Sequence, residues 1–196
     1  MYNENKTKLV NAVFTQVHKK YDFMNDVMSL GIHRIWKKKL IDWMHPQLND
    51  KLIDVASGTG DLAKLFSERT NNNNVICIEP NKDMLRAGKE KLQKFNNISW
   101  YNASAENIPF PDETFDFYTI SYGIRNVTDI NKCLQEAHRV LKTGGRFMCL
   151  EFSKIENEIL DNLYKKYSKF IPILGKHIVG NSMPYDYLIS SIEKFY

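Results

Sequence analysis

The sequence predicts an α/β domain with a mostly parallel sheet, and three features of the chain lead to this prediction. Short apolar runs alternate with amphipathic segments between residues 51 and 152. A glycine turn, Gly58-Thr59-Gly60, follows the first apolar run. The segments before and after this region have the periodicity of helices. Such alternation indicates parallel strands joined by right-handed crossovers, with helices on both faces of the sheet.

Five short apolar or β-branched runs are the expected strands. Asn81 is expected to cap one of the intervening helices, which runs to about Phe95. Gly144 and Gly145 are expected to form only the turn into the last strand. The expected strands are Leu52–Val55, Val75–Ile78, Ile98–Tyr101, Phe115–Ser121 and Arg146–Phe152, and the other helices between them are Asp61–Arg69 and Ile130–Leu141.

The segments on either side of this core are expected to be helical. Residues 1–50 place apolar side chains on shared faces and are expected to form a lid over the binding cleft. Residues 153–196 are expected to be a helical segment on the substrate side. Because no linker or repeat interrupts the chain, residues 1–196 are expected to form a single domain around the core of residues 51–152. The chain stops at an apolar-faced helix without a capping signal, which indicates a truncated form.

The composition is that of an ordinary soluble globular protein. The 196 residues are 43% hydrophobic and 26% charged, and the formal net charge is +4. This mild charge argues against a nucleic-acid binder but tolerates an anionic membrane surface. No apolar run could span a bilayer, and residues 1–6 lack the hydrophobic core of a signal peptide. Cys77, Cys133 and Cys149 are expected to be buried, reduced thiols, with no disulfide and no metal site.

Candidate ligand-binding residues follow the expected strands one after another. In parallel α/β sheets, ligands bind beyond the carboxyl ends of the strands. The glycines of the turn let the backbone approach a ligand closely. Glu79 ends the second strand, about 20 residues after that turn, where a carboxylate accepts both hydroxyls of a ribose. The candidates at these strand ends, in what is then a nucleotide-binding core, are Gly58, Gly60, Glu79, Ser104, Ala105 and Ser121.

Two nucleotide cofactors compete for this pattern, NAD and S-adenosylmethionine. The run from Gly58 to Ala63 also matches the G-x-G-x-x-A fingerprint of NAD enzymes. Asp54 and Asp61 flank the turn, however, and their carboxylates would repel a pyrophosphate and attract the ammonium of adenosylmethionine beside its sulfonium. Residues 1–50 also precede the first strand, whereas NAD fingerprints usually stand close to the start of a domain. We therefore favour S-adenosylmethionine, with Asp54 among its binding residues.

Longer motifs are spread along the chain. They include Tyr21-Asp22-Phe23-Met24-Asn25-Asp26, Asp54-Val55-Ala56-Ser57-Gly58-Thr59-Gly60-Asp61, Gly123-Ile124-Arg125-Asn126-Val127-Thr128 and Leu150-Glu151-Phe152-Ser153. With these motifs the chain closely resembles the ubiquinone/menaquinone biosynthesis C-methyltransferases over nearly its whole length. The first and third motifs are specific to that family, whereas the glycine loop is general to methyltransferases. The chain departs from the family at Ser57, Glu79 and Thr143, where glycine, aspartate and proline are common.

The resemblance implies a Rossmann-like class I methyltransferase sheet with an N-terminal helical extension, from which the C-terminal strands of the family are missing. It implies S-adenosylmethionine-dependent C-methylation of the ring of a polyprenylated benzoquinol or naphthoquinol, in ubiquinone and/or menaquinone biosynthesis. The cofactor contacts that it implies come from Thr59, Glu79, Ser104, Ala105 and Ser121, with Gly58 and Gly60 as a backbone wall.

Three residues are the expected catalytic set. Arg125 and Asn126 follow the fourth strand, where the guanidinium would hold a phenolate oxygen or orient a water, and the amide would bond a second ring oxygen. Tyr21, in the N-terminal lid, is the third candidate, with Asn25 beside it. The alternative for Arg125 is a structural ion pair with an acid such as Asp116 or Asp129. The alternative for Tyr21 is a place in the core.

Other functions stay open at this point. The fold is shared with small-molecule O- and N-methyltransferases, and a truncated chain could be a non-catalytic scaffold of a quinone-synthesis complex. The expected partner is a polyprenylated quinol, and a homodimer or such a complex is also considered. The expected location is the bacterial cytoplasm at the inner face of the membrane, or the matrix side of a mitochondrion.

A long prenyl tail belongs in lipid, so a peripheral membrane contact is expected. Two segments suit the mouth of such a cleft. One is the N-terminal helix with Val10, Phe14 and Val17, and the other is Tyr164–Val179, where apolar side chains alternate with lysines. The alternative is that these are core-packed helices with solvated lysines.

Overall fold

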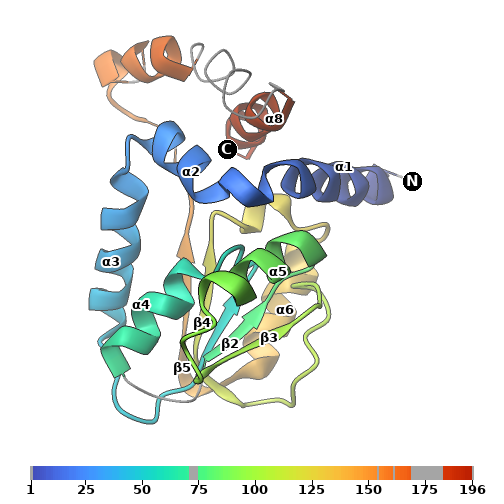
Figure 1. Cartoon of the computed structure of the whole chain (residues 1–196), viewed down its shortest axis with the longest axis vertical. Coiled ribbons are helices and arrows are strands. Elements are labelled where there is room, and N and C mark those ends of the chain that lie inside the picture. The colour runs from blue at the N-terminus through green and yellow to red at the C-terminus, as the bar shows by residue number, and fades with distance from the viewer. Residues whose placement is uncertain (1, 71–74, 154, 161, 169–182, 196) are drawn as a thin grey trace.

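The computed structural model describes residues 2–70, 75–153, 155–160, 162–168 and 183–195 (Figure 1). A five-stranded sheet forms its centre, in the order β3-β2-β1-β4-β5, with every neighbouring pair parallel. The strands are β1 Leu52–Val55, β2 Val75–Ile78, β3 Ile98–Tyr101, β4 Phe115–Ser121 and β5 Leu141–Leu150. The parallel α/β architecture is therefore as the sequence predicts.

Four strands have the bounds expected from the sequence, and the fifth does not. β5 begins at Leu141 rather than Arg146, because Leu141 pairs with Phe115 ahead of a register shift. Gly144 lies within that irregular stretch with a φ of +82°, a conformation that favours glycine. Gly144 and Gly145 thus lie in an irregular stretch inside β5 and do not form a separate turn between α6 (Ile130–Val140) and the strand.

Helices cover both faces of the sheet. Apolar residues of α3 (Ile32–Met44) and α4 (Asp61–Thr70), such as Met44 and Phe66, pack with Leu52 and Phe117 on one face. Those of α6 pack with Ile53 and other strand residues on the opposite face. Successive side chains of β1 point to opposite faces of the sheet, so Leu52 and Ile53 join different apolar clusters. All four residues of β1 are buried, as expected for the central strand of a covered parallel sheet.

The helix after β2 is positioned by its cap. Asn81 accepts hydrogen bonds from the backbone amides of Asp83 and Met84, which confirms the predicted N-cap of α5 (Lys82–Lys91). The helix ends at Lys91, before the predicted Phe95.

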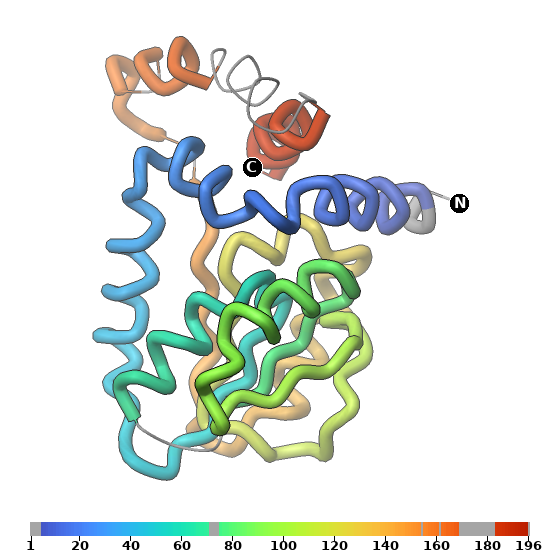
Figure 2. The backbone as a smooth tube through the Cα atoms, in the orientation of Figure 1, coloured from blue at the N-terminus to red at the C-terminus, as the bar shows by residue number. Residues whose placement is uncertain are grey.

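Three further helices lie above the carboxyl ends of the strands (Figure 2). They are α1 (Tyr2–Val17), α2 (Tyr21–Ser29), which follows the short helix η1 (His18–Lys20), and α8 (Met183–Glu193). A separate apolar cluster joins them, formed by Val17, Met24, Met28, Tyr185, Leu188 and Ile192. Residues 158–160 and 162–168 are helical as well. The predicted N-terminal helical extension is therefore present.

Two expectations about surface and burial need correction. Val17, expected at an apolar mouth, is only 1% exposed because it packs in the cluster that joins α1 and α8. Cys149, expected to be buried, is exposed, because β5 is the edge strand of the described sheet. Residues 169–179 of the predicted second mouth segment lie outside the described residues. Among the described helices, none combines the length and apolar character needed to cross a membrane.

Candidate active site

A cleft with a cavity volume of about 110 Å³ opens over the carboxyl ends of β1, β2 and β4. We call it the main cleft. Strand ends and loops form its floor, and α1 crosses over it. It is lined by Thr7, Val10, Asn11, Phe14, Tyr21, Ala56, Gly58, Glu79, Pro80, Asn81, Met84, Ser104, Ala105, Glu106, Ser121, Tyr122, Gly123, Asn126, Val127 and Thr128.

Helix α1 is fixed to both rims of the main cleft. On one side, Lys6 Nζ donates to the carbonyl oxygen of Val127 over 2.7 Å. On the other, Asn81 Nδ2 donates to Oδ1 of Asn11 over 3.1 Å. Asn81 thus holds α1 as well as capping α5. These bonds hold α1 over the cleft, and a lid role for residues 1–50 stays a prediction.

Glu79 is held at the end of β2 by two backbone amides. Its Oε2 accepts from Gly58 N over 2.8 Å, and its Oε1 accepts from Asn81 N over 2.9 Å. Each carboxylate oxygen keeps a further lone pair, so the group could also accept two ribose hydroxyls. Burial raises the pKa of Glu79 to about 7, and the two amides act against that rise.

The two glycines of the turn have different surroundings. Gly58 lines the main cleft with a φ of +59°, and a Cβ there would lie 3.3 Å from Cε1 of Tyr21. Gly60 has a φ of +79°, but its space is taken by Leu92 and Trp100, which a Cβ would meet at 2.7 and 3.0 Å. Gly60 is therefore a packing position beneath the loop, whereas Gly58 is part of the cleft wall.

The remaining predicted cofactor residues of the later strands also line the main cleft. Ala105 is buried, and Ser104 pairs with Asn107 to hold the loop after β3. Ser121 lies at the end of β4, where its hydroxyl is buried and has no hydrogen-bond partner among the described residues. A buried hydroxyl without a partner is costly, so this atom is expected to bond to a ligand or water.

A second space adjoins the main cleft, because Tyr21, Ala56 and Ser121 line both. We call it the Lys37 cavity; Asp54, Thr59 and Asp61 line it as well. Asp54 is buried and accepts from Thr119 Oγ1 over 2.7 Å, and burial raises its pKa to about 7. The structure thus brings Asp54 and Thr59 together beside the glycine loop.

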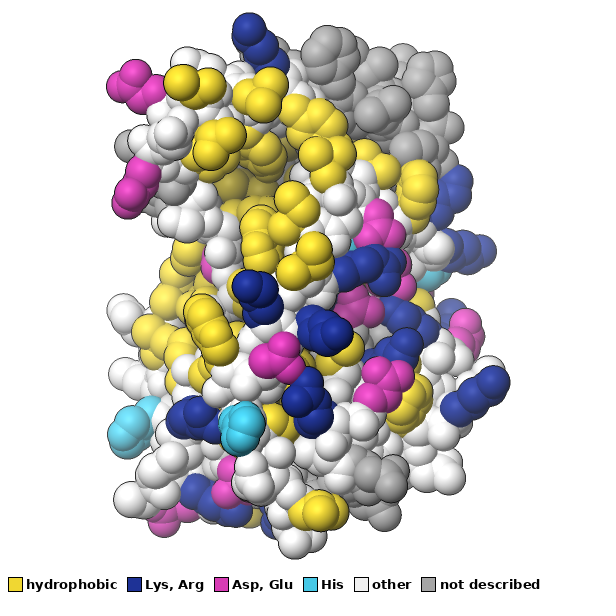
Figure 3. Space-filling model, turned by 90° about the vertical axis from the view of Figure 1, so that its left-hand side faces the viewer, with side chains coloured by type: hydrophobic (Ala, Val, Ile, Leu, Met, Phe, Trp, Pro, Cys, Tyr) yellow, Lys and Arg dark blue, Asp and Glu magenta, His cyan; other side chains and the backbone are white. Residues whose placement is uncertain are grey.

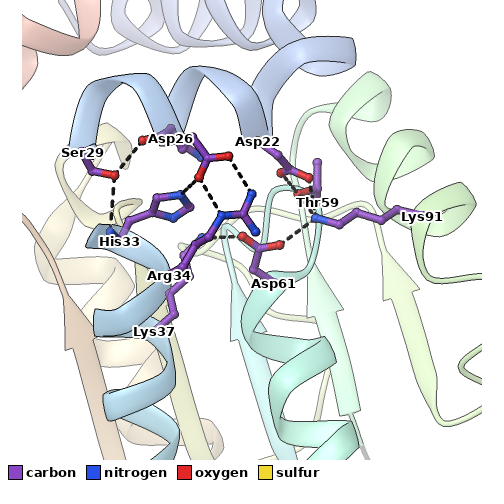
Figure 4. A network of polar contacts seen from close by, with 10 residues as sticks. Asp22, Asp26, Ser29, His33, Arg34, Lys37, Thr59, Asp61 and Lys91 are labelled. Atoms are coloured by element: carbon purple, nitrogen blue, oxygen red, sulfur yellow. Dashed lines mark hydrogen bonds and ion pairs between the residues drawn. The ribbon is translucent and has the colours of Figure 1, made fainter. Parts of the chain in front are cut away.

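Charged residues around the Lys37 cavity form a continuous network (Figure 4). Asp61 accepts from Lys37 Nζ over 2.8 Å and from Lys91 Nζ over 2.7 Å. Thr59 donates to Asp22 of α2 over 2.7 Å. Burial alone would raise the pKa of Asp61, but the two lysines more than offset it and hold that pKa below its usual range. The carboxylate of Asp61, one of the two used in the sequence argument against a pyrophosphate, is therefore largely compensated by lysines in the folded protein.

A third space lies between α2, the loop after β4 and α8. We call it the Arg125 cavity; it is lined by Tyr21, Asn25, Met28, Ser29, His33, Tyr122, Arg125, Phe152 and Leu188. Burial raises the pKa of Tyr21 to about 12, so its phenol stays protonated. The hydroxyl of Tyr122 is buried and has no hydrogen-bond partner among the described residues. Tyr21 lines all three spaces and therefore stands where they meet.

Arg125 and Asn126 lie on either side of this junction. Arg125 lines the Arg125 cavity, donates to Oε1 of Glu151 in a buried ion pair, and donates from Nε to Ser191 Oγ over 3.2 Å. Asn126 lines the main cleft, and its Oδ1 accepts from Tyr187 over 2.9 Å. Arg125 does take part in an ion pair, but not with either expected acid.

Those two acids have other partners. Asp116 accepts from Lys142 Nζ over 2.8 Å, and Asp129 caps α6 by accepting from Lys132 N over 3.1 Å. Asp116 stands at the start of β4, the opposite end of the strand from Arg125, and the Asp129 carboxylate is used in the cap of α6. Proximity along the chain was a poor guide, since the nearest acid in space lies at the end of the neighbouring strand.

Comparison with known proteins identifies the family of this chain. The model of the ubiE/COQ5 methyltransferase family matches residues 1–196. The chain belongs to this family. A Rickettsia bellii protein named ubiquinone/menaquinone biosynthesis C-methyltransferase UbiE is 51% identical over 198 residues, which cover 97% of this chain and 79% of the relative. The protein of the same name from Rickettsia prowazekii is 48% identical over 213 residues, covering 100% and 86%.

Solved structures share the fold of this family member. The YcgJ protein of Bacillus subtilis superposes with a TM-score of 0.57 at 25% identity, covering 71% of this chain and 57% of that one. A putative S-adenosylmethionine-dependent methyltransferase of Methanococcus maripaludis gives 0.62 at 16% identity, covering 92% and 84%. The chain is therefore a methyltransferase of the Rossmann-like class I fold, and S-adenosylmethionine is its cofactor.

The residues at the main cleft fit that cofactor. Glu79 stands where a ribose is expected, Gly58 leaves room beside Tyr21, and the hydroxyl of Ser121 awaits a partner. Of the site residues predicted from the sequence, Gly60 alone lines none of the three spaces. Reasoning from the sequence missed Tyr122 and Glu151 as site residues. Glu151 directly follows β5, so it too satisfies the rule that ligands bind beyond the carboxyl ends of parallel strands.

Proposed function

We propose that this protein transfers the methyl group of S-adenosylmethionine to a ring carbon of a polyprenylated benzoquinol or naphthoquinol, in ubiquinone and/or menaquinone biosynthesis. The observation that carries this proposal is the position of Tyr21. It lines the main cleft, the Lys37 cavity and the Arg125 cavity, so a cofactor and an acceptor ring in neighbouring spaces would meet beside it. The names of the relatives support the acceptor class.

The chemistry requires an activated ring. When bound, the cofactor would supply an electrophilic methyl group and leave as the neutral thioether S-adenosylhomocysteine. A ring carbon becomes nucleophilic once a neighbouring hydroxyl loses its proton to water, and after the new C–C bond forms that carbon gives up its own proton to water. Arg125 would hold the phenolate oxygen, because a guanidinium stays charged and donates hydrogen bonds in a fixed plane. Asn126 would bond a second ring oxygen, and Tyr21 would orient the ring as a protonated phenol. This arrangement stabilises charge that develops during transfer.

Apolar side chains complete the acceptor site. Met28, Phe152 and Leu188 line the Arg125 cavity and would exclude water from the ring. Figure 3 shows apolar side chains gathered over the upper part of one face, around a hollow. Exposed apolar residues of α3 and of the helical residues 158–160 and 162–168 lie in that part of the chain: Ile35, Trp36, Ile159, Leu160 and Leu163. This surface supports a reversible contact with the membrane that holds the prenyl tail.

One assay tests the proposed reaction. The protein is incubated with isotopically labelled adenosylmethionine and with each quinol class, and the products are located by mass spectrometry and NMR. Label on a ring carbon supports the proposal. Label on oxygen or nitrogen would point to another methyltransferase activity, and cofactor binding without turnover of either quinol would point to a scaffold.

The membrane contact has its own test, because it is separable from the chemistry. We expect the protein to sediment with anionic vesicles at low salt and to be released as salt rises. If it stays in the supernatant with substrate-loaded vesicles at low salt, delivery of the substrate depends on a partner protein.

A further inference from the structure

We propose that Lys37 binds the α-carboxylate of the methionine part of the cofactor. Lys37 comes from α3, outside the nucleotide-binding core, so this contact would join the helical extension to the occupied site. The inference rests on the assignment of the main cleft to S-adenosylmethionine. It adds a binding residue that none of the sequence motifs above singled out.

The first argument is the state of the Lys37 ammonium. Lys37 is buried, with its side chain 8% exposed, and burying a charge is costly unless its hydrogen bonds are satisfied. An ammonium has three donors. Lys37 Nζ makes one hydrogen bond in the described structure, to Asp61, and lies 5.8 Å from the centre of the Tyr122 ring. Two donors thus remain for a ligand or water.

The second argument distinguishes Lys37 from the neighbouring lysine. Lys91 Nζ donates to Asp22, Thr59 and Asp61 over 2.6, 3.1 and 2.7 Å. Its three donors are therefore all used within the protein. Lys91 also does not line the Lys37 cavity. Lys37 is the one cation among the described residues that do line it.

The third argument is charge complementarity. The Lys37 cavity presents the ammonium of Lys37 together with the carboxylates of Asp54 and Asp61. The α-amino acid end of the cofactor is a zwitterion, which brings one ammonium and one carboxylate. Its ammonium would bind the aspartates and its carboxylate would bind Lys37, so each charge that enters the cavity meets its opposite.

The fourth argument is the path between the two spaces. Tyr21, Ala56 and Ser121 line both the main cleft and the Lys37 cavity. A ligand whose ribose lies at Glu79 would therefore reach the cavity with its amino acid end. The core of residues 51–152 contributes no lysine or arginine to the described wall of this cavity. The carboxylate of the ligand therefore needs Lys37 for a cationic partner.

The test compares two ligands that differ in this carboxylate. Affinities of S-adenosylmethionine and of decarboxylated S-adenosylmethionine are measured by calorimetry on wild type and on Lys37→Met, which keeps an unbranched side chain one atom shorter and without the charge. We expect Lys37→Met to bind adenosylmethionine about 10- to 100-fold more weakly, as for a lost charge-assisted bond. Its affinity for the decarboxylated ligand should stay within about twofold of wild type.

Two further variants complete the design. Lys38→Met removes an exposed lysine of the same helix and should change neither affinity. Lys37→Arg keeps the charge and should recover most of the lost affinity for adenosylmethionine. If Lys37→Met does not fold, Lys37→Arg and the wild-type difference between the two ligands still measure what the carboxylate contributes.

Each contrary outcome has a separate meaning. Equal weakening of both ligands by Lys37→Met would show that Lys37 acts only through the structure and would overturn the inference. Unchanged affinity for adenosylmethionine would overturn it as well. If wild type bound neither ligand, the cofactor assignment itself would fail, which is distinguishable from a failure of Lys37 alone.

Discussion

Arg125 donates from Nη1 to Oε1 of Glu151, so that a buried ion pair joins the loop after β4 to the end of β5. The two side chains are only 4% and 8% exposed. Glu151 Oε1 also accepts from Phe152 N over 2.9 Å, and its Oε2 is buried without a partner among the described residues. The pair fixes the guanidinium at the wall of the Arg125 cavity, where the acceptor ring is proposed to bind.

Arg125→Ala is expected to abolish methyl transfer and to destabilise the fold by about 3–5 kcal/mol, because it leaves the Glu151 carboxylate buried and unpaired. The double variant Arg125→Leu with Glu151→Leu should recover most of that stability but none of the activity. Urea unfolding and single-turnover rates measure the two effects. Wild-type turnover by the folded double variant would show that Arg125 has a structural role only.

Tyr187→Phe is expected to slow methyl transfer without changing the affinity for S-adenosylmethionine, because Asn126 Oδ1 loses its hydrogen-bond donor. The expected loss of stability is about 1 kcal/mol. Tyr185→Phe is a matched control in the same helix, since the hydroxyl of Tyr185 has no partner among the described residues. The idea fails if both variants have the same single-turnover rate.

Glu79→Ala is expected to weaken the binding of S-adenosylmethionine by about 1–3 kcal/mol, because two ribose hydroxyls lose their acceptor. Glu79→Gln keeps one acceptor oxygen and should lose less. Glu90→Gln changes an exposed residue of α5 and should bind as wild type does. Unchanged affinity of Glu79→Ala in calorimetry would remove Glu79 from the cofactor site.

The affinity for the cofactor is expected to depend on pH near neutrality. Burial raises the pKa of both Glu79 and Asp54 to about 7, above their ordinary values of 4.5 and 3.8. In the folded protein without ligand, both carboxyl groups therefore bind protons more tightly than in the unfolded chain. The stability that this difference contributes is lost as pH rises through about 7. Ribose hydroxyls and an ammonium prefer the ionised carboxylates, so binding should strengthen over the same range.

This linkage predicts that binding of the cofactor releases protons near pH 7. Calorimetry in buffers of different ionisation enthalpy measures the number released. Glu79→Gln should release fewer protons than wild type. Binding that involves no proton transfer in either protein would contradict the assignment of Glu79 and Asp54 to the ligand.

Gly60→Ala is expected to destabilise the protein more than Gly31→Ala. Both glycines have similar left-handed backbones, with φ of +79° and +76°, so alanine costs about 1 kcal/mol in strain at either position. A Cβ on Gly60 would also meet Leu92 at 2.7 Å, whereas one on Gly31 meets nothing within 4 Å. The overpacking should add about 1–3 kcal/mol, measured by urea unfolding. Equal losses would refute the packing role of Gly60.

The sequence by itself determined the sheet and one wall of the site. β1, β2, β3 and β4 have the bounds that apolar or β-branched runs predict. For the inner strands β1, β2 and β4 the reason is burial between two helical layers, which requires such runs. The cap at Asn81 was equally visible, since capping depends on residues two and three positions away. Glu79 and Ser121 followed from the rule that parallel strands end at one edge of the sheet.

Only the tertiary structure decided which charges meet. Lys37 reaches Asp61 from another helix, and Arg125 pairs with Glu151 rather than with an acid nearer in sequence. Such partners depend on how helices and strand ends pack, which periodicity does not specify. The same reason explains Cys149, whose apolar strand indicated burial although its edge position leaves it exposed. Local patterns determine elements, whereas distances between distant side chains exist only once those elements are packed.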